Sequence, residues 1–211
     1  MTDASITAEK LLQIGAVQLN PAEPFTWASG WKSPIYCDNR KILSFPYVRD
    51  YIKSELCNAV FEKYPDAEGI AGVATAGIAW GAMVADQLKL PFIYVRPKPK
   101  EHGLGNQIEG HFEKGQKTVI IEDLISTGKS SLEVVNVLKQ QDIEVLGLVS
   151  IFNYDFPYAQ KSFTSAVVPF YSLTNYPTLI FIAQKQGLIA ENHEEILLKW
   201  RDDPENWAGV T

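Results

Sequence analysis

The order of apolar and polar positions along this chain predicts an α/β fold. Apolar residues recur at helical spacing over residues 7–17 and again after Pro46, which predicts two helices, the second ending near Tyr64. Between them, residues 20–40 are rich in proline, glycine and tryptophan and predict turns with short extended pieces. From residue 69 onward, short apolar runs alternate with helical patterns. That alternation is typical of a parallel sheet with helices on both faces.

The alternating region predicts which strand is central. Three consecutive apolar residues, Val119, Ile120 and Ile121, indicate a strand that is buried on both faces. The C-terminal tail has apolar residues at helical spacing and predicts two closing helices. The predicted strands are 69–74, 91–95, 117–122, 144–152 and 166–173, and the predicted helices between them include 77–90 and 131–141.

Composition and charge exclude several classes of protein. With 211 residues, 46% of them hydrophobic, the chain can bury one sizeable core. The formal net charge of -6 argues against chain-wide binding of nucleic acid. Cys37 and Cys57 form no metal-binding pattern, so we expect free thiols in a reducing compartment. No signal-peptide pattern is visible and no apolar run approaches the ~20 residues of a membrane span, so we expect a soluble, cytoplasmic protein.

The most informative residues follow the predicted central strand, where ligands of parallel sheets bind. Glu122 and Asp123 end that strand, and the turn STGKSS then opens a helix. Small residues, hydroxyl groups and a helix N-terminus favour binding of a phosphate monoester. The two carboxylates suit sugar hydroxyls or a divalent ion. A plain strand–turn–helix joint with capping serines is the alternative interpretation.

Two nucleotide-binding motifs are excluded by single residues. A P-loop needs a glycine five positions before Gly128, and this chain has Asp123 there. The dinucleotide-binding pattern begins at Gly103 and Gly105, but Ile108 stands where the third glycine belongs. The acidic pair and the hydroxyl-rich turn therefore need another explanation.

The stretch VIIEDLISTGKSS resembles the phosphoribosyl pyrophosphate-binding motif of the type I phosphoribosyltransferases. The resemblance implies that family's fold, an α/β domain with a central, mainly parallel sheet flanked by helices and a small N-terminal hood. In the family, the acidic pair holds the ribose hydroxyls and the following loop holds the 5-phosphate. The residues implied to bind phosphoribosyl pyrophosphate here are Glu122, Asp123, Leu124, Ile125, Ser126, Thr127, Gly128, Lys129 and Ser130.

A second candidate segment, residues 94–110, combines cations with glycines. Arg96, Lys98, Lys100 and His102 lie close together in the sequence YVRPKPKEHGLGNQIEG. Their charges would neutralise a pyrophosphate leaving group, and closure of a glycine-rich loop would exclude water from an activated sugar. A solvated basic loop is the simpler alternative.

This second segment resembles the catalytic loop of orotate phosphoribosyltransferases. The resemblance implies that Arg96, Lys100 and His102 are catalytic and contact the pyrophosphate. It also implies a homodimer in which each loop reaches the partner's site. Many members have a second lysine directly after the arginine, where this chain has Pro97. Whether Lys98 takes the place of that lysine stays open.

Residues 25–40, FTWASGWKSPIYCDNR, resemble the hood of the Gram-positive-like subgroup of these enzymes. Orotate is a flat ring with a carboxylate, which backbone groups and a cation can bind. Ala28 stands where other branches have a substrate-binding lysine, and SIFNYD lacks the arginine that binds orotate in those branches. Ser126, Lys32 and Arg40 are the candidates for binding the orotate carboxylate, and we expect Ser126 to bind orotate.

The sequence GVATAGIAW, residues 72–80, matches the family's pyrophosphate turn. The matching positions run from Ala74 to Gly77, with Ala76 where some relatives have a lysine. Small side chains let the backbone approach a ligand, but tight packing of a strand on a helix gives the same composition. Both interpretations stay open at this point.

The resemblance runs from Phe25 to Trp200 and implies an orotate phosphoribosyltransferase that acts in UMP synthesis. It implies Mg²⁺ bound mainly through phosphoribosyl pyrophosphate, with no metal site belonging to the protein alone. We expect one domain over 1–211, with the N-terminal helix and hood in 1–45, the α/β core in 46–165 and a C-terminal strand and helices in 166–211. The alternatives are a purine-base phosphoribosyltransferase and a non-catalytic regulator that binds phosphoribosyl pyrophosphate.

Overall fold

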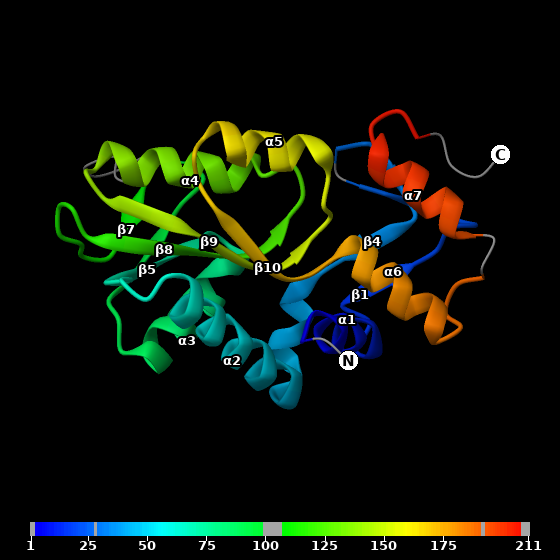
Figure 1. Ribbon diagram of the computed structural model, residues 1–211, viewed down its shortest axis with the longest axis horizontal. Coiled ribbons are helices and arrows are strands. Elements are labelled where there is room, and N and C mark those ends of the chain that lie inside the picture. Colours follow the sequence, from blue (N-terminus) through cyan, green and yellow to red (C-terminus); the bar gives the residue numbers. More distant parts are fainter. Residues whose placement is uncertain (1–2, 28, 99–106, 191–192, 208–211) are drawn as a thin grey trace.

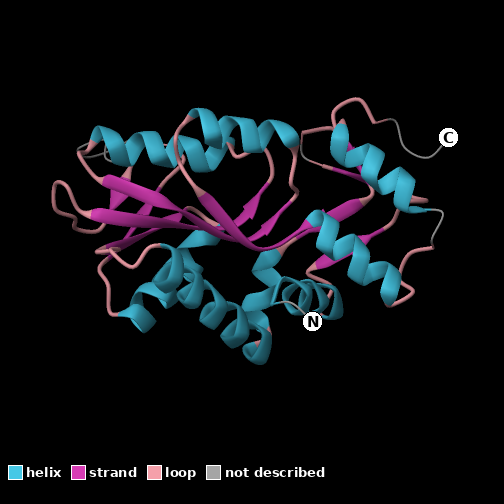
Figure 2. Cartoon of the chain, in the orientation of Figure 1, coloured by secondary structure: helices cyan, strands magenta, loops and turns pink. Residues whose placement is uncertain are grey.

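The computed structural model describes residues 3–27, 29–98, 107–190 and 193–207 of the chain. Its centre is a six-stranded sheet that lies between two layers of helices (Figures 1 and 2). Neighbouring strands of this sheet are parallel except for the last pair, β6 and β7, which is antiparallel. In spatial order the strands are β10 (Phe170–Asn175), β9 (Glu144–Asn153), β8 (Lys117–Ile125), β5 (Gly69–Val73), β6 (Phe92–Val95) and β7 (Ile108–Glu109).

Helices cover both faces of this sheet. On one face lie α4 (Lys129–Gln140) and α5 (Pro157–Ser165) (Figure 1). On the other lie α2 (Pro46–Lys63) and α3 (Ala76–Leu88), with α1 (Asp3–Gln13) beside the edge strand β10. The side chains of Val119, Ile120 and Ile121 are 0% exposed. The prediction that their strand is central and buried on both faces is therefore confirmed.

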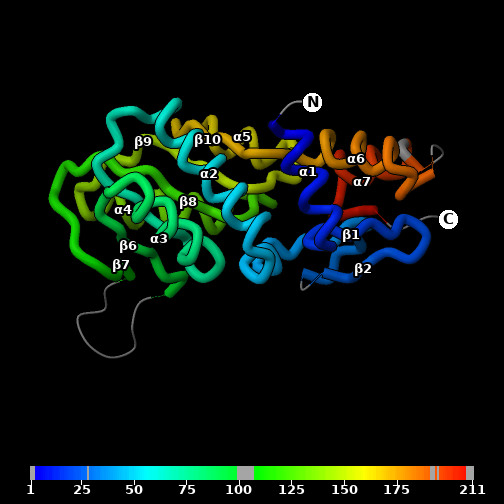
Figure 3. Tube along the Cα trace, turned by 90° about the horizontal axis from the view of Figure 1, so that it is seen from below, coloured from blue at the N-terminus to red at the C-terminus, as the bar shows by residue number. Residues whose placement is uncertain are grey.

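The hood is formed by two short strand pairs next to the C-terminal helices. These helices are α6 (Tyr176–Lys185) and α7 (Glu194–Asp202), and Figure 3 shows them grouped with the hood at one end of the long axis. The antiparallel pairs are β1 with β4 and β2 with β3. The hood strands are β1 (Val17–Leu19), β2 (Phe25–Thr26), β3 (Lys32–Ser33) and β4 (Ile35–Cys37), and a 3₁₀ helix, η1 (Asn39–Ser44), leads from the hood to α2.

An aromatic cluster joins the hood to the rest of the molecule. Trp27 of the hood lies 5.0 Å from Tyr154 and 5.6 Å from Trp200, measured between ring centroids. Trp200 is 0% exposed, and its indole N–H donates a hydrogen bond of 3.1 Å to the backbone carbonyl of Lys32. The C-terminal helix α7 therefore holds the β2–β3 hairpin in place.

Four details differ from the sequence-based expectation. The first helix ends at Gln13 because the chain turns at Gly15, whose φ is +64°, so Val17 lies in β1 instead. Strand β8 continues three residues past Glu122, since β9 runs on to Asn153 and supplies hydrogen-bond partners. The helix α5 and the short strand β7 were not predicted, because their apolar patterns are brief.

The remaining predicted elements are confirmed, with shifted ends. Strand β10 begins at Phe170 instead of residue 166, and Val167 just before it has a left-handed φ of +54°, which strands do not adopt. Because β10 pairs with β9, this C-terminal strand completes the main sheet. No helix in the described part of the chain is long and apolar enough to cross a membrane.

Candidate active site

Two neighbouring carboxyl groups lie in the last half of β8. Glu122 is 5% exposed, and its two oxygens accept hydrogen bonds from the backbone N–H of Asp123 (3.0 Å) and the hydroxyl of Ser131 (3.3 Å). Asp123 is half-buried. Because β8 continues through this pair, the carboxyl groups are held by the sheet. The expectation that the strand ends at Glu122 is therefore wrong.

Burial dominates the electrostatics of this pair. It raises the pKa of Glu122 well above the usual range, and the neighbouring charge of Asp123 raises it further. Burial also raises the pKa of Asp123, while the nearby charge of Arg40 acts in the opposite direction. The two carboxyl groups are therefore reluctant to carry two negative charges together. Hydroxyl donors or a cation between them would relieve that repulsion.

The hood contacts the acidic pair directly. The side-chain amide of Asn39, which is 1% exposed, donates a hydrogen bond of 2.7 Å to the backbone carbonyl of Asp123. The Cys37 thiol donates to the amide oxygen of Asn39 at 3.4 Å, and burial raises the pKa of that thiol well above its usual value. Burial likewise raises the pKa of Cys57 to about 11. Both thiols are free, and the raised pKa values disfavour the thiolate, which is the nucleophilic form of cysteine.

The hydroxyl-rich turn lies between β8 and α4, as predicted. Gly128 has a φ of +75°, and a Cβ atom there would lie 2.6 Å from the ring of Phe163. The Thr127 hydroxyl accepts a hydrogen bond of 3.2 Å from the backbone N–H of Lys129. Ser126 and Thr127 are half-buried, while Lys129 is exposed. The turn therefore presents hydroxyl groups and the N-terminal end of α4 to an anion.

Two further residues implied by the motif are part of the sheet itself. Ile125 is 1% exposed and its backbone carbonyl accepts a hydrogen bond of 3.0 Å from the N–H of Tyr154. Leu124 is half-buried and pairs with Phe152 of β9. The Ile125 side chain belongs to the core, which leaves Ser126 as the first residue of the motif beyond the strand.

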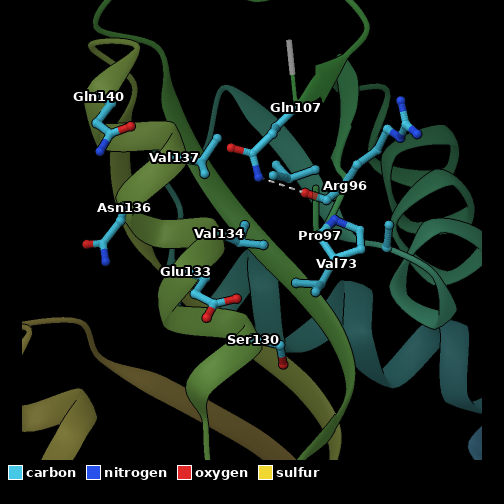
Figure 4. A pocket seen from close by; sticks show the side chains of 12 residues that line it. Val73, Arg96, Pro97, Gln107, Ser130, Glu133, Val134, Asn136, Val137 and Gln140 are labelled. Carbon is cyan, nitrogen blue, oxygen red and sulfur yellow. Dashed lines mark hydrogen bonds between the residues drawn. The ribbon is translucent and has the colours of Figure 1, made fainter. Parts of the chain in front are cut away.

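A cavity of about 380 Å³ brings together parts of all three predicted segments. Ala74 of the pyrophosphate turn lines it. Arg96 of the basic segment and Ser130 of the hydroxyl-rich turn also line it (Figure 4). The other lining residues are Val73, Val95, Pro97, Gln107, Glu133, Val134, Asn136, Val137 and Gln140. Residues that are far apart in sequence thus meet where β5 and β6 end and α4 begins.

The ends of the basic segment are fastened to each other. The backbone N–H of Arg96 donates to the carbonyl of Gln107 (2.8 Å), and the Gln107 side-chain amide donates to the carbonyl of Arg96 (3.2 Å) (Figure 4). The Arg96 guanidinium points away from α4 and lies 3.6 Å from the Glu109 carboxylate. Lys98 is exposed. Lys100 and His102, and also Ala28 of the hood, lie outside the described residues.

The small residues of the pyrophosphate turn have a packing role. A Cβ atom on Gly72 would lie 2.8 Å from the carbonyl oxygen of Gly77, and one on Gly77 would lie 2.6 Å from that of Ile121. These glycines therefore let α3 approach β5 and β8 closely. Thr75 is exposed and Ala74 is half-buried, so the turn itself stays accessible.

Comparison with known proteins identifies the family. A phosphoribosyl transferase domain matches residues 52–167. The chain is 52% identical to the orotate phosphoribosyltransferase of Bacteroides fragilis, over 95% of this chain and 94% of that protein. This chain belongs to the orotate phosphoribosyltransferase family. It is also 51% identical to the orotate phosphoribosyltransferase of Streptococcus pneumoniae, over 98% of this chain and 99% of that protein.

Solved structures agree with the family assignment. The crystal structure of orotate phosphoribosyltransferase from Aeropyrum pernix matches with a TM-score of 0.75 and 28% identity, covering 87% of this chain and 99% of that one. The type I phosphoribosyltransferase fold is therefore confirmed. Identity of about half to orotate phosphoribosyltransferases, over nearly the full length, does not favour the purine-base and regulator alternatives.

Sequence reasoning missed two residues that shape this orotate phosphoribosyltransferase site. Asn39 fixes the backbone at Asp123, and Phe163 lies against the glycine of the hydroxyl-rich turn. The hood segment SPIYCDNR contains Asn39, but nothing in that segment points to a partner 84 residues away. Phe163 belongs to α5, the helix that was not predicted.

Proposed function

We propose that this chain transfers the ribose 5-phosphate group from phosphoribosyl pyrophosphate to orotate, giving orotidine 5′-monophosphate and pyrophosphate in UMP synthesis. The observation that carries the proposal is the β8–α4 junction, where a buried acidic pair precedes a hydroxyl-rich turn. That junction belongs to a chain 52% identical to an orotate phosphoribosyltransferase. The enzyme is thus a pentosyltransferase.

The junction supports binding of the phosphorylated sugar. Glu122 and Asp123 accept hydrogen bonds from the ribose hydroxyls, which are donors that suit two crowded carboxylates. The hydroxyl groups of Ser126, Thr127 and Ser130 and the first N–H groups of α4 bind the 5-phosphate. The left-handed conformation of Gly128 turns the backbone into that cradle.

The basic segment and the pyrophosphate turn act on the leaving group. Arg96, Lys100 and His102 bind the pyrophosphate as the bond from the anomeric carbon to oxygen breaks. Ala74 of the pyrophosphate turn lines the same cavity as Arg96. The ring nitrogen of orotate, already deprotonated, then forms the new bond to carbon. The protein mainly positions the two reactants, and no strong general base is needed.

Magnesium enters this proposal together with the substrate. Among the described residues, no group of three or more His, Cys, Asp or Glu side chains gathers as a metal site. Mg²⁺ prefers six oxygen ligands, so the pair Glu122 and Asp123 supplies too few by itself and substrate oxygens must supply the rest. When bound, Mg²⁺ offsets the charge of the pyrophosphate.

We further propose that the chain forms a homodimer in which the basic segment of each subunit reaches the neighbouring site. We also propose a cytoplasmic location, which suits the two free thiols.

A turnover assay tests the proposal. The purified chain is given phosphoribosyl pyrophosphate and one base at a time, with and without Mg²⁺. We expect release of pyrophosphate with orotate and Mg²⁺, and none with adenine, guanine or xanthine. Turnover of a purine base in preference to orotate would support the purine-base alternative. Absence of product with every base, together with ligand-dependent binding of RNA or DNA, would support the regulator instead.

A further inference from the structure

The hood places a cation beside the acidic pair. Asn39 is hydrogen-bonded to the backbone of Asp123 at 2.7 Å, so the neighbouring residues Asp38 and Arg40 are held at the same edge of β8. Arg40 is close enough to Asp123 and to Tyr36 for electrostatic interaction with both. Tyr36 lies on β4, which pairs with β1 in the hood. Arg40 therefore lies where the hood meets the strand that carries the acidic pair.

The Arg40 guanidinium is oriented but keeps free donors. Its Nε donates to one oxygen of the Asp38 carboxylate at 2.7 Å, and Nη2 donates to the other at 3.1 Å. Nη1 remains available, and the Arg40 side chain is 66% exposed. A planar guanidinium held on one edge presents its other edge to a second carboxylate in a fixed direction. Asp38 therefore acts as the residue that positions Arg40.

The other two cations of the hood are engaged elsewhere. The Lys32 ammonium donates to the hydroxyl of Thr26 at 2.9 Å, within the exposed β2–β3 hairpin. The Lys41 ammonium donates to the backbone carbonyl of Gly15 at 3.0 Å, beside the first helix. Neither contact directs its lysine toward β8. Of these three cations, Arg40 is the one that directly follows Asn39, which is hydrogen-bonded to Asp123 of β8.

We infer that Arg40 binds the carboxylate of the pyrimidine base and so selects orotate over bases that lack it. This inference rests on the proposed function. The base arrives at the anomeric carbon of a ribose held by Glu122 and Asp123, and its carboxylate needs a charged donor within reach of that position.

The test compares two nucleotides that differ only by this carboxylate. The affinities of orotidine 5′-monophosphate and uridine 5′-monophosphate are measured by titration calorimetry. The proteins compared are the purified native enzyme and the variants Arg40→Ala, Arg40→Lys, Lys32→Ala and Lys41→Ala. We expect Arg40→Ala to weaken binding of orotidine 5′-monophosphate roughly 10- to 100-fold while uridine 5′-monophosphate binds within about twofold of native. Arg40→Lys should lose less affinity for orotidine 5′-monophosphate than Arg40→Ala, because lysine keeps the positive charge.

The control variants separate the possible failures. Lys41→Ala removes the adjacent cation and should leave both affinities unchanged. The inference would be overturned if Arg40→Ala lost affinity equally for both nucleotides, or for neither. It would also be overturned if Lys32→Ala, instead of Arg40→Ala, lost the preference for orotidine 5′-monophosphate over uridine 5′-monophosphate. The native enzyme's turnover of orotate is measured alongside. If the native enzyme turns over orotate but Arg40→Ala still prefers orotidine 5′-monophosphate to uridine 5′-monophosphate, only the inference about Arg40 is wrong. If the native enzyme does not use orotate, the proposed function is wrong.

Discussion

The amide of Asn39 and the backbone carbonyl of Asp123 are joined by a 2.7 Å hydrogen bond across 84 positions of sequence. This bond connects the hood to the strand that carries the acidic pair. Because Asn39 is 1% exposed, water cannot replace the amide easily. The hood and the carboxyl end of β8 are therefore held in a fixed relation to each other.

Replacing Asn39 by alanine tests that relation. The Asp123 carbonyl loses its donor, so the acidic pair shifts and binding of phosphoribosyl pyrophosphate weakens by about tenfold, as expected for roughly 1–2 kcal/mol. Isothermal titration measures this affinity. The control is Asn58→Ala, which removes an exposed amide that donates to Glu55 at 3.4 Å and should change nothing. Unchanged affinity in Asn39→Ala would show that the bond is structural only.

Replacing Glu122 by glutamine should stabilise the protein near neutral pH while lowering its affinity for phosphoribosyl pyrophosphate. Burial, followed by the charge of Asp123, raises the folded-state pKa of Glu122 above its ordinary value of 4.5. The folded state then holds this proton more tightly than the unfolded state, so the free energy of unfolding falls as pH rises through the raised pKa. Glutamine avoids that loss. The gain in melting temperature should therefore shrink as the pH approaches 4.5 and below.

Thermal unfolding without substrate, recorded across the acid and neutral range, checks this expectation. Glu195→Gln serves as the control, because its hydrogen bond from Lys199 lowers the pKa of Glu195 and its side chain is 78% exposed. That variant should show no gain at neutral pH. A Glu122→Gln variant that is less stable than native at neutral pH would contradict the assigned direction of the pKa shift.

Alanine at Gly128 should damage both stability and phosphate binding. The new Cβ would lie 2.6 Å from the Phe163 ring, and φ is +75°. Gly115 has nearly the same φ, +76°, but nothing within 4 Å of the added atom, so Gly115→Ala measures the backbone strain alone. We expect Gly115→Ala to lower the free energy of unfolding by about 1 kcal/mol, and Gly128→Ala to lower it by about 1–3 kcal/mol more. Chemical denaturation measures both values.

A second-site change shows whether the clash is the cause. Phe163→Leu removes the ring atoms nearest to the added Cβ, so combining it with Gly128→Ala should cost less than the sum of the two single changes. Affinity for phosphoribosyl pyrophosphate should recover in part. Strict additivity in the double variant would assign the whole effect of Gly128→Ala to its backbone conformation.

Alanine at Lys100 should lower turnover roughly 10²- to 10³-fold, because a cation that stabilises the leaving pyrophosphate is lost. The melting temperature should stay unchanged. Mixing Lys100→Ala with Asp123→Asn subunits tests whether the basic segment acts across a dimer, since one site of each mixed dimer then has both native residues. Recovery of turnover on subunit exchange is expected. Mixed dimers that form and remain inactive would place the segment at its own subunit's site.

Alanine at Trp200 should destabilise the protein by about 3–5 kcal/mol, as expected for the loss of a buried aromatic side chain. The Lys32 carbonyl also loses its donor. Leu198 lies on the same helix and is 36% exposed, so Leu198→Ala should cost less than about 1 kcal/mol. Urea titration measures both values. Equal effects of the two variants would mean that the hood does not depend on the indole contact.

The sequence predicted the sheet well because its signals are local. Consecutive apolar residues at Val119–Ile121 define a strand buried on both faces. The small residues around Gly72 and Gly77 left two interpretations open, of which the structure shows the close strand–helix contact. The acidic pair and the turn that follows were also recognisable, since each is contiguous in sequence. Predicting what these residues bind, however, required the resemblance to the type I phosphoribosyltransferases.

What the sequence could not predict depends on contacts between distant segments. Nothing local pairs Asn39 with Asp123, places the ring of Phe163 against Gly128, or extends β8 to Ile125. The strand extension depends on how far the partner β9 runs, which is a property of the assembled sheet. The hydrogen-bond partners of Lys32 and Arg40, Thr26 and Asp38, could likewise not be read from the sequence.

The contact between Trp200 and the Lys32 carbonyl has a consequence for biosynthesis of the enzyme on the ribosome. Domains form as the chain emerges, N-terminal residues first. The hood is translated early, but the indole that holds it comes 168 residues later. A nascent chain can therefore pair the strands of its main sheet, the last of which ends at Asn175, before Trp200 is available to hold the β2–β3 hairpin.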